Sequence, residues 1–250
     1  MSGSTSGSTS GSTGGSRRGA ELRLLSGGAA QGVASALVHS FFAETGVEVS
    51  ATFQAVGALR EKLLAGEPCD VFISTQAMVQ ELALAQHIVA DTIMPLGSVH
   101  TAIAVRAGDR IPAIARRDEL RATLAAAAAI YVPDPERATA GIHFVRMLRT
   151  LELHEQVVPR LRTYPSGTLA MAALAGSTEG GCIGCTQVTE INATPGVKLV
   201  GALSAEFELA TVYAVGVCGT TPHPALARRF ARMISGPESL RLRIQAGFEL

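Results

Sequence analysis

The 250-residue sequence contains no tryptophan, and aromatic residues make up only 4% of it. Stacking platforms for bases or sugars need several aromatic side chains, so this scarcity argues against that mode of binding. Basic and acidic residues number 21 each, which leaves a formal net charge of zero. A chain without net charge has no overall attraction for a nucleic acid or an anionic membrane surface. We therefore predict a small-molecule ligand and no nucleic-acid partner.

Long apolar runs are also missing. No stretch reaches the roughly 18 consecutive apolar residues of a membrane-spanning helix, so we expect no insertion into a membrane. Residues 1–19 repeat glycine, serine and threonine without an apolar core, which is typical of a flexible tail or an added linker and not of a secretory signal. We expect a cytoplasmic protein if this segment is native, and a periplasmic one if it replaces a leader.

Cysteine is scarce, and its spacing gives little support for a metal site. Cys182 and Cys185 form the single CxxC pair among four cysteines, and the six histidines are scattered along the chain. A zinc site usually needs two such pairs or histidines at ligand spacing. The sequence therefore predicts buried structural cysteines, with no metal and no cofactor.

The stretch Leu22–Gly32 is the most informative one that is present. A short apolar run ends at Ser26-Gly27-Gly28, and a helical pattern starts directly afterwards. The first N–H groups of a helix lack internal partners and carry partial positive charge, so a glycine turn at that point can receive an anion. The alternative is a plain strand-to-helix connection, and the stretch fits neither the dinucleotide nor the P-loop pattern.

The same strand–turn–helix pattern recurs along the chain. A second turn holds Val56 and Gly57, and a third follows the apolar run 71–73. The strand pattern at 99–105 predicts a crossing into a second lobe, and the one at 209–217 a return. We predict a first lobe of residues 20–99 plus 216–250, and a second lobe of residues 100–215.

The second lobe supplies two further turns before helices, at Thr139-Ala140 and at Ser166-Gly167-Thr168. We also expect Asp118 and Thr186 to cap short helices, because their side-chain oxygens suit the N-cap position. Turns at the carboxyl ends of parallel strands share one edge of a sheet. The sequence therefore predicts that four turns, two from each lobe, point their amides into one crevice.

An ordered set of short motifs resembles the molybdate-binding members of the type II periplasmic solute-binding proteins. These motifs are Gly66–Ser74, Asp134-Pro135-Glu136, Ala140-Gly141, Gly236-Pro237 and Gly247-Phe248. The resemblance implies a two-lobed α/β fold, each lobe a mixed, mostly parallel sheet flanked by helices. It also implies a ligand held in the cleft, closure of the lobes around it, and the permease of an ABC transporter as partner for an exported protein.

The sequence departs from that family at three ligand positions. Ala29 and Val56 stand where the resemblance implies serines, and Cys185 stands where it implies a tyrosine from the second lobe. Backbone amides and the hydroxyls of Ser26, Ser166 and Thr168 remain as donors. The predicted ligand-binding residues are Ser26, Gly27, Gly28, Ala29, Val56, Gly57, Thr139, Ala140, Ser166, Gly167, Thr168 and Cys185.

Three functions remain open on the sequence. The first is binding of a small anion, either an oxyanion or a small carboxylate, for an ABC transporter. The second is an isomerase that shifts a proton along an unsaturated di- or tricarboxylate, because some proteins of this fold are similar to aconitate isomerases. Its acid/base candidates are Cys185, Tyr164 and Glu190. The third is a ligand sensor that docks on another protein.

Overall fold

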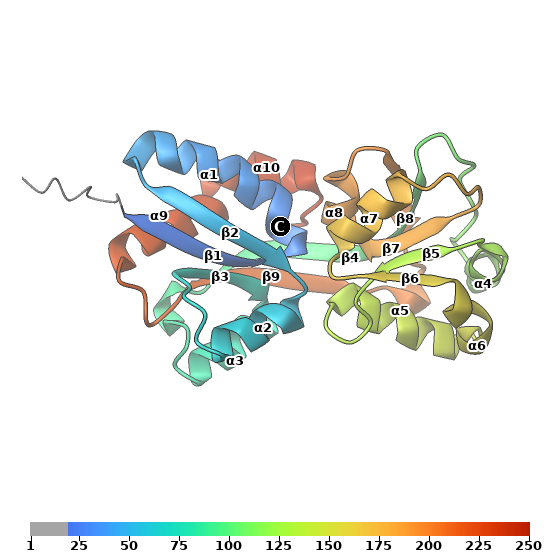
Figure 1. Ribbon diagram of the computed structural model, residues 1–250, viewed down its shortest axis with the longest axis horizontal. Coiled ribbons are helices and arrows are strands. Elements are labelled where there is room, and N and C mark those ends of the chain that lie inside the picture. Colours follow the sequence, from blue (N-terminus) through green and yellow to red (C-terminus); the bar gives the residue numbers. More distant parts are fainter. Residues whose placement is uncertain (1–19) are drawn as a thin grey trace, which may run out of the picture.

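The computed structural model describes residues 20–250 and has an α/β fold with two lobes along its long axis (Figure 1). The predicted two-lobed type II fold is confirmed. The strands are β1 (Glu21–Gly27), β2 (Glu48–Gln54), β3 (Val71–Thr75), β4 (Met94–Arg106), β5 (Ile130–Pro133), β6 (Leu161–Tyr164), β7 (Ile183–Gln187), β8 (Val197–Ala202) and β9 (Ala210–Val217). The α-helices are α1 (Gln31–Thr45), α2 (Val56–Leu64), α3 (Gln76–Leu84), α4 (Arg117–Ala126), α5 (Thr139–Thr150), α6 (His154–Val157), α7 (Gly167–Ala175), α8 (Val188–Asn192), α9 (Pro224–Ser235) and α10 (Leu240–Ala246). Short 3-10 helices are η1 (Gly28–Ala30), η2 (Ala90–Thr92), η3 (Val158–Arg160), η4 (Ala205–Phe207) and η5 (Pro237–Ser239).

The first lobe is built on strands in the order β2-β1-β3-β9-β4. β1 is parallel to β2 and β3, whereas β9 is antiparallel to β3 and β4. Helices α1, α9 and α10 lie on one side of this sheet, and α2 and α3 lie on the other (Figure 1). Alternate apolar side chains of the strands fill the core on each side, and Phe41 packs edge-on against Phe230 at 5.2 Å.

The second lobe uses β4, β5, β6, β7 and β8. β5 is parallel to β6 and β7, while β4 is antiparallel to β7 and β8. Helices α4 to α8 cover this sheet (Figure 1). The carboxyl ends of β5, β6 and β7 therefore face the first lobe and lead into α5, α7 and α8.

β4 joins the two lobes as one continuous strand. It pairs with β9 up to His100 and with β7 from Thr101. All of β9 pairs within the first sheet, including Ala210–Val215, which the predicted boundary placed in the second lobe. The division into lobes at residues 99 and 216 itself stays a prediction.

Two predicted helix caps are wrong. α4 begins after Arg116, whose backbone N–H is bound by Glu119, and Asp118 lies within the first turn. The N-cap of α8 is Gln187, and Thr186 ends β7 with its hydroxyl directed at Glu190. Both errors have the same cause, because spacing along the sequence did not fix where the preceding strand or loop ended.

Candidate functional site

A small cavity of about 20 Å³ lies between the two lobes. Each of the four predicted turns contributes to its wall, through Gly28 and Ala29, Val56, Thr139 and Ala140, and Ser166 and Gly167. The lining residues are Gly28, Ala29, Gln54, Ala55, Val56, Pro133, Ala138, Thr139, Ala140, Ser166, Gly167, Gln187, Glu190 and Tyr213. The starts of four helical segments from both lobes thus meet at one place.

A wider chamber of about 500 Å³ adjoins this cavity and shares Gln54 and Ala55 with it. Its other lining residues are Ala58, Asp134, Pro135, Glu136, Arg137, Thr163, Tyr164 and Pro165. Residues of both lobes form its walls, so it is the outer part of the same interlobe cleft. Among residues 20–250, Arg137 is the one basic residue in this lining, and two acidic residues accompany it.

Glu190 is the acidic side chain of the inner cavity. It lies on α8 and is only 6% exposed. Its Oε2 accepts a hydrogen bond of 2.5 Å from the Thr186 hydroxyl. The carboxylate is also within hydrogen-bonding reach of the backbone N–H groups of Gln187, Gly167 and Thr168. The start of α7 therefore already faces a carboxyl group from the same chain.

Burial raises the pKa of Glu190, and its hydrogen bonds from Thr186 and the backbone oppose that shift only in part. Desolvation penalises the charged form, which favours a protonated carboxyl group. The group can thus donate or accept a proton inside the cleft. A carboxyl group with these properties suits both recognition of an anion and acid/base chemistry.

Two glycines lie against this carboxyl group. A Cβ atom placed on Gly28 would lie 2.1 Å from Oε1 of Glu190, and one on Gly167 would lie 2.1 Å from Oε2. Gly28 belongs to the first lobe and Gly167 to the second. The Glu190 carboxyl group is consequently held between helix starts of both lobes.

Tyr213, Gln187 and Gln54 also line the inner cavity, although the sequence did not point to them. Tyr213 comes from β9, and its hydroxyl lies within hydrogen-bonding reach of the Thr139 side chain on α5, across the cavity. Burial and the nearby Glu190 raise the pKa of Tyr213 above its usual range. In the sequence it stands inside an apolar strand, where a core position was the simpler interpretation.

The second turn uses its glycine amide for contact between the lobes. Gly57 N donates to the carbonyl oxygen of Arg137 at 3.0 Å. The Arg137 side chain pairs with Glu61 of α2 at 3.1 Å. The structure is therefore closed at this point, and the Gly57 amide has a partner from the opposite lobe.

Comparison with known proteins matches residues 22–249 to the family described as bacterial extracellular solute-binding protein. The match covers most of the chain. The chain belongs to this family.

The proteins similar to this solute-binding protein include one enzyme as well as binding proteins. It is 24% identical to an aconitate isomerase of Pseudomonas sp. over 226 residues, covering 88% of this chain and 84% of that one. It superposes on the periplasmic molybdate-binding protein of Azotobacter vinelandii with a TM-score of 0.74 at 18% identity, covering 92% and 99% of the two chains. For the sulfate-binding protein SubI of Mycobacterium tuberculosis the TM-score is 0.71 at 19% identity, with 92% and 86% covered. The two structures support the fold and carry no ligand over to this chain.

Several predicted site residues lie away from the inner cavity of the solute-binding protein. Ser26 is buried and its hydroxyl donates to the Gly27 carbonyl, while Thr168 has a buried hydroxyl without a hydrogen-bond partner among residues 20–250. Tyr164 lines the outer chamber and stacks on Tyr131 at 6.0 Å. Gly27 faces Tyr213 and Val56, and its role stays a prediction.

Cys185 does not reach the cleft, which corrects its place among the candidates. It is fully buried in the core of the second lobe, and burial raises the pKa of its thiol well above the ordinary value. Its neighbour along β7, Thr186, faces Glu190 instead. Because side chains alternate along a strand, the resemblance alone could not decide which of the two residues faces the ligand.

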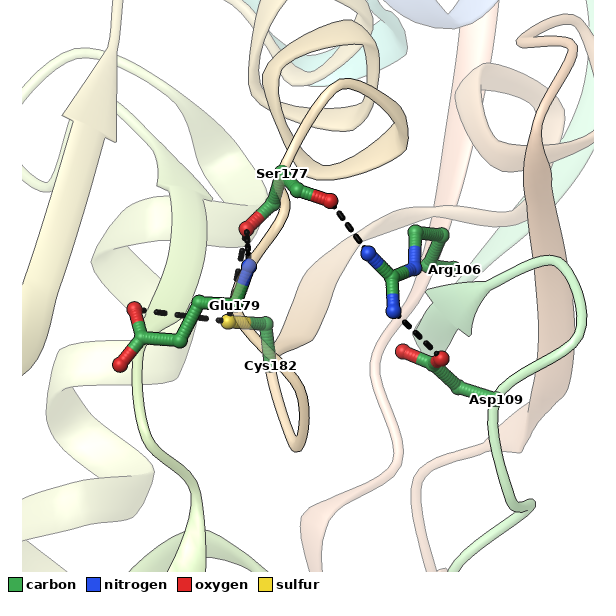
Figure 2. Close-up of polar contacts among 5 residues, drawn as sticks. All are labelled: Arg106, Asp109, Ser177, Glu179 and Cys182. Carbon is green, nitrogen blue, oxygen red and sulfur yellow. Dashed lines mark hydrogen bonds and ion pairs between the residues drawn. The ribbon is translucent and has the colours of Figure 1, made fainter.

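The other cysteine of the CxxC pair lies in a polar cluster at the opposite end of β7 (Figure 2). Cys182 Sγ contacts Glu179, and Arg106 binds both the Ser177 carbonyl and Asp109. Within residues 20–250, no three His, Cys, Asp or Glu side chains are grouped to hold a metal ion. No helix in the same part of the chain is long and apolar enough to cross a membrane.

Proposed function

We propose that this solute-binding protein binds a small anion in the cleft between its lobes. The observation that carries the proposal is the convergence of four helix starts, two from each lobe, on the cavity around Glu190. Unpaired N–H groups and partial positive charge at helix starts favour an anion there. Both lobes contribute, so the ligand stabilises the closed arrangement.

The energy required is within reach of this arrangement. A micromolar ligand needs a binding free energy of about 8 kcal/mol. Hydrogen bonds to a charged group contribute about 1.5 to 3 kcal/mol each, so four or five are sufficient. The amides of Gly28, Ala29, Thr139 and Ala140 and the hydroxyl of Ser166 offer that number of groups around the cavity.

A panel of candidate anions tests this function. The protein is melted in the presence of molybdate, tungstate, sulfate, phosphate and small di- and tricarboxylates. At 100 times its dissociation constant a ligand adds about 2.7 kcal/mol of stability. We expect Gly28→Val to remove this ligand effect, because its side chain occupies the space of Glu190 Oε1.

Gly180→Val is the matched control, because a Cβ at Gly180 meets nothing within 4 Å. It should respond to ligand as the unmodified protein does. Stabilisation by none of the anions, or equal stabilisation of the Gly28→Val variant, would contradict binding at this cavity.

An isomerase of an unsaturated di- or tricarboxylate is a second candidate, and the specific observation behind it is Glu190. This carboxyl group is buried at the cleft with a raised pKa, and a relative of the chain is an aconitate isomerase. As a base, Glu190 would take a proton from one allylic carbon, and the resulting acid would return it to the other. The neighbouring amides and hydroxyls would stabilise the enolate-like charge that develops between these steps.

The isomerase is tested by following the ultraviolet absorbance of trans-aconitate and the uptake of deuterium from D2O. Turnover that is lost in Glu190→Gln while binding persists supports catalysis. If the absorbance of trans-aconitate stays constant while carboxylates still stabilise the protein, the isomerase is contradicted and anion binding remains the function. In that role the expected partner is the permease of an ABC transporter.

A further inference from the structure

Glu190 occupies the position to which the helix starts of both lobes point. Its two carboxyl oxygens lie against Gly28 of the first lobe and Gly167 of the second. The Thr186 hydroxyl binds it, and the amides at the start of α7 lie within hydrogen-bonding reach of it. A carboxyl group of the chain itself thus occupies the place beside α7 where a free anion would lie.

The volume that remains beside Glu190 is small. The inner cavity measures about 20 Å³, which is roughly the room needed by one water molecule. A tetrahedral oxyanion has five heavy atoms and does not fit there unless the Glu190 side chain moves. Its movement would break the Thr186 hydrogen bond and expose a buried carboxyl group.

The charges around the cleft also oppose a compact, doubly charged ion, whose whole charge would have to enter beside Glu190. Arg137 is the basic residue lining the outer chamber, and it is already paired with Glu61 and near Asp134. In the part of the chain that the structure describes, the cleft lining therefore offers no unpaired cation to offset two negative charges placed together beside Glu190.

We propose that Glu190 determines which anions this cleft accepts. Its carboxyl group fills the amide cradle and excludes tetrahedral oxyanions. Organic carboxylates are accepted, because one carboxylate group can share the proton of the Glu190 carboxyl group while the rest of the ligand and its other charges lie in the outer chamber. This inference rests on the proposed anion-binding function and names the ligand class of that site.

Removing the carboxyl group tests the proposal. Dissociation constants for sulfate and molybdate are measured by calorimetry on the unmodified protein and on Glu190→Ala. We expect Glu190→Ala to bind at least one of the two ions at least tenfold more tightly. Glu48→Ala is the control, because Glu48 is exposed on β2 and the variant changes the net charge by the same amount.

A folding defect does not prevent the test. If Glu190→Ala does not melt cooperatively, Glu190→Ser replaces it, because a serine hydroxyl still satisfies part of the Thr186 and amide pairing. The proposal is overturned if a folded variant gains no oxyanion binding. It is also overturned if the unmodified protein binds sulfate and molybdate as tightly as the Glu190 variant does.

The outcome is separable from that of the proposed function. Failure of every anion on the unmodified protein contradicts the proposed function, whether or not the variant gains oxyanion binding. Binding of organic carboxylates by the unmodified protein, without an oxyanion gain in the variant, overturns the role of Glu190 alone.

Discussion

The backbone amide of Gly57 donates a 3.0 Å hydrogen bond to the carbonyl oxygen of Arg137 on the opposite lobe. The contact leaves little space, since a Cβ atom on Gly57 would lie 3.0 Å from that oxygen and 3.2 Å from the Arg137 Cα. The lobes therefore meet backbone to backbone at this point, and closure depends on a residue without a side chain.

We expect Gly57→Ala to shift the protein toward an open form. The added methyl group disfavours the closed contact, and a reduced closed population weakens binding in proportion, by about threefold to tenfold for a shift near 1 kcal/mol. Small-angle scattering measures the shift toward the open form. A titration with an anion that stabilises the unmodified protein measures the loss of affinity. Gly180→Ala, at an open position, should leave both unchanged. An unaltered radius of gyration and affinity in Gly57→Ala would show that the contact does not govern closure.

Glu190 should make the stability of the protein depend on pH. Its pKa is raised in the folded state, so the folded protein holds the proton more tightly than the unfolded chain does. The resulting stabilisation is complete below the unfolded value of about 4.3 and is lost as the pH rises through the folded value. The titratable group that faces it is Tyr213, which stays protonated throughout.

The measurement is a series of melting curves for the unmodified protein and for Glu190→Gln. The difference in melting temperature, unmodified minus variant, should fall as the pH rises from about 4 toward neutrality. A difference that grows with pH would mean that the folded protein favours the carboxylate, which would contradict a raised pKa for Glu190.

Arg243 should be essential for the C-terminal segment of the first lobe. Its guanidinium is buried and donates to four acceptors, which are the carbonyls of Leu96, Ser235 and Gly236 and the hydroxyl of Ser239. Lysine has three donors on one nitrogen and cannot reach all four. We expect Arg243→Lys to lower the free energy of unfolding by about 2 to 4 kcal/mol, because each abandoned buried acceptor costs about 1 to 3 kcal/mol.

Urea unfolding gives this value, and Arg241→Lys is the control. Arg241 is exposed on the same helix, so its change should stay within about 0.5 kcal/mol. Similar free energies for the two variants would mean that the Arg243 network contributes little.

The packing of Phe230 against Phe41 predicts a large loss on truncation. Both rings are fully buried and meet edge-on with centroids 5.2 Å apart. Phe230→Ala should cost about 3 to 5 kcal/mol in chemical unfolding, which is typical of a large aromatic side chain removed from a core. Phe42→Ala, at a half-exposed position, should cost far less. Equal losses of unfolding free energy in Phe230→Ala and Phe42→Ala would contradict a large contribution of the Phe230–Phe41 contact to stability.

The order of strands, turns and helices was predictable from the sequence, because each depends on neighbours in the chain. The helix starts predicted after the turns lie in the structure at Gly28, Val56, Thr139 and Gly167. The resemblance added the two-lobed arrangement, and the family match supports it. The convergence of the turns followed from the rule that parallel strands share one carboxyl edge.

Only the tertiary structure decided what fills the crevice. The carboxyl group of Glu190 lies between Gly28 and Gly167, two residues far apart in the sequence, and the Gly57 amide is bound by the opposite lobe. Cys185 faces the core while Thr186 faces Glu190, because side chains alternate along β7 and its orientation is set by packing. Local patterns determine which segments form helices and strands. The direction of a side chain and the partner of an amide depend on contacts between distant segments, which the sequence does not specify locally.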